Sequence, residues 1–178
     1  MSTIRLARVF ADNAVLQRNK EIHIWGFFAG GGSVSVEFAN NKAECVCDDS
    51  GRFDAVFPAM DKGGPYTITA RDENGESVCG KNIMIGDVVI VSGQSNMEFP
   101  MVRVRETYPC EWDNERNDMI RTFKVTENGV FKAPLADVET GEWIAASAET
   151  LDDYSAVGYF TAKHMRDHED VCVGIIDL

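Results

Sequence analysis

The sequence predicts an α+β chain in two parts: an all-β sandwich over residues 1–82, then the first part of a flavodoxin-like parallel α/β sheet over residues 83–178. Two observations predict this. Up to residue 82, apolar and polar side chains alternate with a period of two, and turn-forming residues recur at roughly ten-residue spacing. From residue 83 on, apolar strand-like runs alternate with a helical pattern, which is typical of a parallel sheet with right-handed crossovers.

The β part is best illustrated by residues 33–38, where Val34, Val36 and Phe38 alternate with polar residues. Residues 22–27 show the same alternation through Ile22 and Ile24. Such strands have one buried face, and short strands separated by frequent turns favour an antiparallel sandwich.

The α/β part begins with the β-branched run Val88–Val91, and we expect a strand at 87–92 in the centre of a parallel sheet. The patterns predict further strands at 120–125, 143–144 and 171–176, and a loop from Thr126 to Ala136. They also predict a helix capped by Ser155, with Val157, Phe160, Thr161 and His164 on its apolar stripe. About three parallel strands are fewer than the five or so of a flavodoxin-like sheet, so we expect the chain to be a fragment of a longer protein.

Composition excludes several classes of protein. The net charge is −12, which argues against a nucleic-acid partner, because binding to a phosphate backbone needs clustered Lys and Arg. No apolar run is long enough for a membrane span, and the N-terminus has no signal-peptide core, so we expect a cytoplasmic protein unless a signal was removed upstream. The five cysteines are odd in number and lack metal-type spacing, which favours free thiols: Cys45, Cys47, Cys79, Cys110 and Cys172.

The segment GDVVIVSGQSNMEFPM, residues 86–101, carries the strongest functional signal. Open α/β sheets place reactive groups at the carboxyl ends of their strands, and Ser95 follows such a strand where a helix could begin. The alternative is an ordinary turn serine without chemistry. The nucleophile elbow of α/β-hydrolases does not fit, because Met97 occupies the position of its second glycine.

GQSNM after an apolar strand resembles the nucleophile block of SGNH (GDSL-like) esterases, and specifically that of the sialate O-acetylesterase family. The resemblance continues on both sides of this block and covers nearly the whole chain. The similar segments are LARVFADNAVLQRNKEIHIWGFFAGGGSVSVEF upstream, and MIRTFKV, GEWIAAS, YSAVGYFTAKHM and VCVGIID downstream.

This resemblance implies a serine esterase that removes O-acetyl groups from sugars or glycans, without a cofactor or metal. It makes Ser95 the nucleophile, with its own backbone N–H as an oxyanion donor, and places Gln94 and Asn96 in the substrate pocket. The alternative for Gln94 and Asn96 is a pair of turn residues without substrate contact. The family's catalytic His and Asp would lie beyond Leu178, so we expect the chain alone to be inactive, and to self-associate or to pair with the missing C-terminal segment. The competing hypothesis is a non-catalytic carbohydrate-binding or interaction module.

Other candidate residues have simpler explanations. His23 fits a half-exposed strand residue, and His164 fits the edge of a core. His164 and His168 are spaced i, i+4, but no third metal ligand is evident. Trp112 and Trp143 could stack on sugar rings, although a lone tryptophan is more often part of a core.

Overall fold

The computed structural model describes residues 4–113, 117–125 and 135–178. It divides into two compact units, Met1–Ile85 and Gly86–Leu178. Of the loop expected over residues 126–136, residues 126–134 lie outside the described part. None of the helices in the described part is long and apolar enough to cross a membrane.

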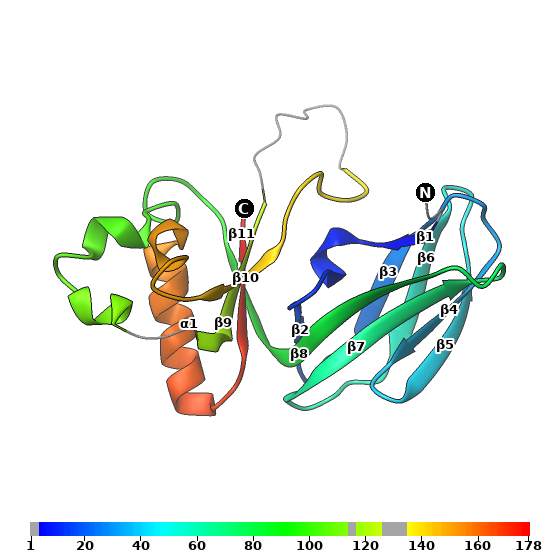
Figure 1. Ribbon diagram of the computed structural model, residues 1–178, viewed down its shortest axis with the longest axis horizontal. Coiled ribbons are helices and arrows are strands. Elements are labelled where there is room, and N and C mark those ends of the chain that lie inside the picture. The colour runs from blue at the N-terminus through cyan, green and yellow to red at the C-terminus, as the bar shows by residue number, and fades with distance from the viewer. Residues whose placement is uncertain (1–3, 114–116, 126–134) are drawn as a thin grey trace. The chain divides into compact units, whose positions relative to one another are not determined.

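The first unit is an antiparallel β-sandwich (Figure 1). One sheet has the order β1-β3-β6, and the other has the order β8-β7-β4-β5. The side chains of Val34, Val36 and Phe38 are buried as their alternation predicted, and the Phe38 ring lies 5.8 Å from the Phe57 ring of the facing sheet. The strands are β1 Ile4–Leu6, β2 Val15–Gln17, β3 Ile22–Phe28, β4 Ser33–Phe38, β5 Asn41–Val46, β6 Arg52–Phe57, β7 Gly63–Asp72 and β8 Ser77–Val91.

The second unit contains the predicted partial parallel sheet, in the order β10-β9-β11-β8. β11 (Val173–Asp177) is parallel to both β9 (Asn117–Lys124) and the last residues of β8. β10 (Trp143–Ala146) is antiparallel to β9. Three parallel strands therefore form, and the predicted fold class is confirmed.

The central position expected for strand 87–92 is wrong, because β11 is the strand with a parallel neighbour on each side. Apolar runs predict which segments form strands. They do not predict the order of the strands, which depends on where the chain returns to the sheet.

The helix α1, Ala156–Glu169, begins as predicted at Ser155, whose hydroxyl accepts a hydrogen bond from the Gly158 N–H. The predicted apolar stripe is wrong, since Val157, Thr161 and His164 are exposed and Phe160 is only partly buried. The buried face consists of Ala156, Gly158, Tyr159 and Ala162. Small residues on that face let the helix pack closely on the sheet: a Cβ at Gly158 would lie only 3.0 Å from Val91.

The remaining elements of the second unit are short 3₁₀ helices, which lie on the same side of this unit as α1 (Figure 1). They are η2 (Met101–Val104), η3 (Pro109–Trp112) and η4 (Leu151–Asp153), and the first unit contains η1 (Arg8–Phe10). Met101, Trp112 and Leu151 contribute their side chains to the core between these elements and α1.

Candidate active site

Ser95 lies in a turn just after the carboxyl end of β8. The Gln94 carbonyl accepts hydrogen bonds from the Met97 N–H at 2.7 Å and the Glu98 N–H at 3.2 Å, which closes one helical turn. The α-helix that could have followed does not form, because Pro100 disfavours a helical conformation at Phe99, and the chain becomes extended there before η2. Ser95 thus occupies a single turn at the carboxyl edge of the parallel strands.

The groups that an acyl-transfer nucleophile needs are accessible on Ser95. The residue is exposed, and neither its hydroxyl nor its backbone N–H is hydrogen-bonded within the described part of the chain. A free backbone N–H beside a serine hydroxyl can donate to the oxyanion that forms when the hydroxyl attacks a carbonyl. The geometry of the turn is therefore compatible with nucleophilic catalysis.

Two features fix the position of this turn. Gly93 has φ +145, a conformation that residues with a Cβ rarely adopt, and a Cβ there would lie 3.2 Å from the Met97 side chain. The chain after the turn is tied to the start of α1, because Ala156 N–H donates to Phe99 C=O and Met101 N–H donates to Tyr154 C=O. The turn is thus held at both of its ends.

Neither histidine of the second unit is placed to serve as a base for Ser95. His23 belongs to the first unit, where its ring lies 3.2 Å from the Asp54 carboxylate on a neighbouring strand. Gly158 of α1 packs on Val91 at the end of β8. His164 is exposed and lies six residues further along α1, which is about 9 Å along the helix axis toward the opposite edge of the sheet. His168 Nδ1 lies 2.8 Å from the His164 carbonyl oxygen.

Asp177 is an acidic residue at the carboxyl edge that the sequence analysis did not single out. It ends β11, pairs in register with Val91 and is buried. Burial raises the pKa of its carboxyl group; the nearby Glu98 raises it further, and Lys124 opposes both effects. Only the strand register brings Asp177 beside the end of β8, and no local sequence pattern signals it.

The other predicted site residues fall into two groups. Gln94 and Asn96 are exposed on the same turn as Ser95, and their contact with a substrate stays a prediction. The two tryptophans belong to the core: Trp143 packs on Phe123, and the Trp112 indole N–H donates to Asp152 at 2.8 Å. Their burial leaves no face open for a sugar ring.

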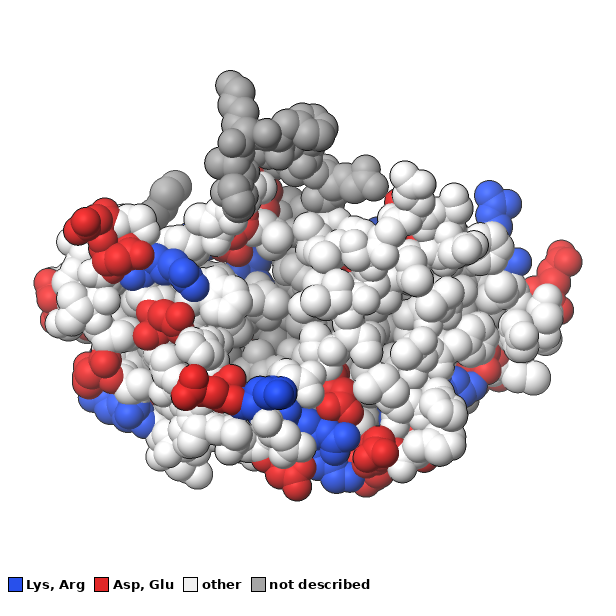
Figure 2. Space-filling model, turned by 180° about the vertical axis from the view of Figure 1, so that it is seen from behind, with Lys and Arg blue, Asp and Glu red and all other residues white. Residues whose placement is uncertain are grey.

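The cysteines and potential metal ligands form no site. None of the five cysteines, all of which lie in the described part of the chain, forms a disulfide, and burial raises the pKa of both Cys45 and Cys172 to about 11. Among the described residues, no cluster of three or more His, Cys, Asp or Glu could hold a metal ion. On the face in Figure 2, basic and acidic residues lie intermixed, without a broad basic patch among the described residues.

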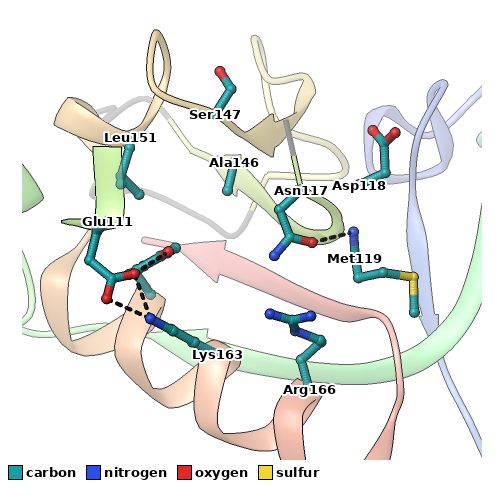
Figure 3. Close-up of a pocket in the computed structure, with 10 residues that line it drawn as sticks. Glu111, Asn117, Asp118, Met119, Ala146, Ser147, Leu151, Lys163 and Arg166 are labelled. Carbon is teal, nitrogen blue, oxygen red and sulfur yellow. Dashed lines mark hydrogen bonds and ion pairs between the residues drawn. The ribbon is translucent and has the colours of Figure 1, made fainter. Parts of the chain in front are cut away.

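A pocket of about 570 Å³ lies at the opposite, amino-terminal edge of the sheet. Its walls come from η3, the start of β9, the end of β10 and the second half of α1 (Figure 3). Ser95 does not line this pocket, which is therefore separate from the Ser95 turn.

Comparisons with known proteins find similar curated proteins and similar solved structures, while no protein-family model matches. The chain is 24% identical to the sialate O-acetylesterase of Rattus norvegicus over 97% of its own length, and 27% identical to that of Mus musculus over 68%. The crystal structure of a carbohydrate acetylesterase from Xanthomonas citri superposes on 98% of the chain with a TM-score of 0.90 and 30% identity. The resemblance to the sialate O-acetylesterase family is confirmed.

The chain spans only part of each of these relatives. It covers 35% of the rat sialate O-acetylesterase, 24% of the mouse protein and 39% of the Xanthomonas citri chain. Over its own length, the chain has the fold of the Xanthomonas citri enzyme and is similar in sequence to the sialate O-acetylesterases.

Proposed function

We propose that the chain carries the nucleophile of a carbohydrate O-acetylesterase, acting on O-acetylated sialic acids or other acetylated glycans, and that Ser95 is this nucleophile. The observation that carries the proposal is the position of Ser95. It is exposed in a turn at the carboxyl end of a parallel strand, with its hydroxyl and N–H unengaged in the described chain. The chain that contains this turn superposes on a carbohydrate acetylesterase over 98% of the chain's own residues.

The proposed reaction proceeds in two steps. In the first step, Ser95 Oγ attacks the acetyl carbonyl carbon and loses its proton to a base, and the Ser95 N–H donates to the resulting oxyanion. The tetrahedral intermediate then releases the sugar hydroxyl, which takes up that proton, and leaves an acetyl ester on Ser95. In the second step, water attacks the acetyl-enzyme with help from the same base and releases acetate.

The base is proposed to come from outside these 178 residues. This is supported by the placement of the histidines of the second unit, neither of which lies beside Ser95, and by the partial coverage of the relatives. A serine hydroxyl without a base is a weak nucleophile at neutral pH. We therefore propose that the chain alone is essentially inactive, and that it self-associates or captures a segment that completes the sheet.

The test is acetyl-ester hydrolysis measured on p-nitrophenyl acetate and on an O-acetylated sugar. The 178-residue chain should match its Ser95→Ala variant within about twofold. A longer form of the protein should turn over both substrates and lose most of this activity on Ser95→Ala, since removing the nucleophile of a serine triad costs on the order of 10⁶ in rate.

A longer form that loses less than about tenfold on Ser95→Ala would show that Ser95 is not the nucleophile. Turnover by the 178-residue chain well above that of its Ser95→Ala variant would instead place a base within these residues. Gly75→Asn, a substitution in an open turn of the first unit, is the control and should leave the rate unchanged.

A further inference from the structure

The pocket at the amino-terminal edge of the second unit's sheet is unrelated to the proposed chemistry at Ser95, yet polar groups from three elements line it. Glu111 comes from η3, Asn117 from the start of β9, and Lys163 and Arg166 from α1, while Ser147 lies in the turn after β10 (Figure 3). Met119, Ala146 and Leu151 add apolar surface. A volume of about 570 Å³ lies within the range of small-molecule sites.

One wall of the pocket is a closed ion-pair network. The Lys163 ammonium lies 2.5 and 2.6 Å from the two Glu111 carboxylate oxygens, and the Tyr159 hydroxyl donates to Glu111 at 2.9 Å. Burial and the Glu111 carboxylate raise the pKa of Tyr159, which therefore remains a neutral donor. Lys163 and Glu111 balance each other's charge, so this wall is close to neutral. The hydrogen bonds between Glu111, Lys163 and Tyr159 hold the three side chains in place.

Arg166 is different, because its guanidinium is only partly used. One terminal nitrogen, Nη2, lies 3.0 Å from the exposed Asp167 carboxylate. The Nε atom is buried and has no hydrogen-bond acceptor in the described chain, and Nη1 likewise contacts none. A buried charged donor without an acceptor carries a free-energy cost, and the Nη1 group, which is not fully buried, is the guanidinium donor that an anionic ligand could reach.

The surroundings of Arg166 favour a particular kind of anion. In Figure 3 the guanidinium points toward the Asn117 side chain, and the Asp118 carboxylate points away from it. Glu111 balances the charge of Lys163, so Arg166 is the cation whose charge is not balanced within the pocket's described lining, and the site matches a single negative charge better than a doubly charged phosphate. A carboxylate is planar and accepts two parallel N–H bonds from a guanidinium.

We propose that this pocket binds a small molecule through a carboxylate group held by Arg166. Asn117 bonds its polar atoms, and its apolar part packs toward Met119 and Leu151. The site belongs to a ligand other than the ester at the Ser95 turn, because the two sites lie at opposite edges of the sheet.

The test is an NMR titration of the ¹⁵N-labelled 178-residue chain with benzoate, at constant ionic strength, observing the arginine Nε–Hε signals. The Arg166 signal is assigned as the one missing from Arg166→Lys, and the exposed Arg103, assigned through Arg103→Lys, is the matched control. Benzamide is the neutral isostere of the probe, and inorganic phosphate is the second anion.

Benzoate should shift the Arg166 signal saturably and leave the Arg103 signal in place. Benzamide and phosphate should each bind at least about tenfold more weakly, a difference of about 1.4 kcal/mol. Asn117→Ala should weaken benzoate binding several-fold with the fold retained, as judged by the dispersion of the amide spectrum.

Shifts that grow linearly without saturation, or that affect Arg103 equally, would overturn the proposal, because they would show unspecific association. Unchanged benzoate affinity in Asn117→Ala would overturn it too, as would saturable shifts of the backbone amides of the pocket that are equally large in Arg166→Lys. Tighter binding of phosphate than of benzoate would refute the assignment of a carboxylate. None of these readouts depends on esterase activity, so the inference stands or falls independently of the function proposed for Ser95.

Discussion

The ion pair between Glu111 and Lys163 provides a quantitative test of the second unit. In Lys163→Met the aliphatic stem is kept and the ammonium is removed, which leaves the Glu111 carboxylate with the Tyr159 hydroxyl as its one remaining hydrogen-bond partner among the described residues. The Glu111 side chain is 12% exposed and the Lys163 side chain 31% exposed. Exposed pairs contribute up to about 1 kcal/mol, and breaking a buried pair costs about 3–5 kcal/mol. We expect an intermediate loss of about 2 kcal/mol in the free energy of unfolding.

The assay is urea unfolding followed by tryptophan fluorescence in a Trp25→Phe background. The chain has three tryptophans, so only Trp112 and Trp143 then report, and both lie in the second unit. Glu111→Gln/Lys163→Met should be more stable than Lys163→Met alone, because it contains no unpaired carboxylate. A loss below about 0.5 kcal/mol in Lys163→Met, or additive effects in the double variant, would refute the reasoning, since contacting residues should couple.

Three further predictions concern other parts of the second unit and the thiols. Gly86→Ala should destabilise the second unit by at least about 2 kcal/mol in the same urea assay, because a Cβ there would lie 1.9 Å from the Cys172 carbonyl oxygen; an unchanged midpoint would contradict this packing. Asp177→Asn should raise the melting temperature at pH 7. The folded-state pKa of Asp177 is raised, so the ionised carboxylate opposes folding at a pH above that pKa. The gain in melting temperature from Asp177→Asn should therefore shrink as the pH falls toward the pKa, and a gain that grows on acidification would contradict this sign. Ellman's reagent at pH 8 should label the exposed Cys79 and Cys110 quickly, and Cys45 and Cys172, each with a pKa of about 11, far more slowly; equal rates for all the thiols would be inconsistent with the burial described.

The features that the sequence predicted correctly are those set by local periodicity. The alternation of Val34, Val36 and Phe38 fixed one face of a strand, and Ser155 marked the start of α1 through its side-chain hydrogen bond. The apolar run before Ser92 placed Ser95 after a strand. Each of these depends on neighbours within a few residues, where the backbone geometry of strands and helix caps is restrictive.

The features that the sequence predicted wrongly, or did not predict, depend on contacts between residues that are far apart in the chain. The buried face of α1 was missed because Gly158 and Ala162 add little hydrophobicity, although they allow the helix to pack closely on β11. β11 was not expected in the middle of the sheet, because strand order depends on how the chain crosses between strands. The pocket could not be foreseen, since Glu111, Asn117 and Arg166 lie far apart in the sequence and meet only at one edge of the sheet.

The central claim is that Ser95 is an activated nucleophile, and covalent labelling tests it most directly. A longer form of the protein would be incubated with a fluorophosphonate, digested, and examined by tandem mass spectrometry, with and without an O-acetylated sugar as competitor. We expect a single adduct on Ser95, which should be absent from Ser95→Ala and suppressed by the acetylated sugar. An adduct on another serine, or esterase activity that persists without labelling at Ser95, would contradict it.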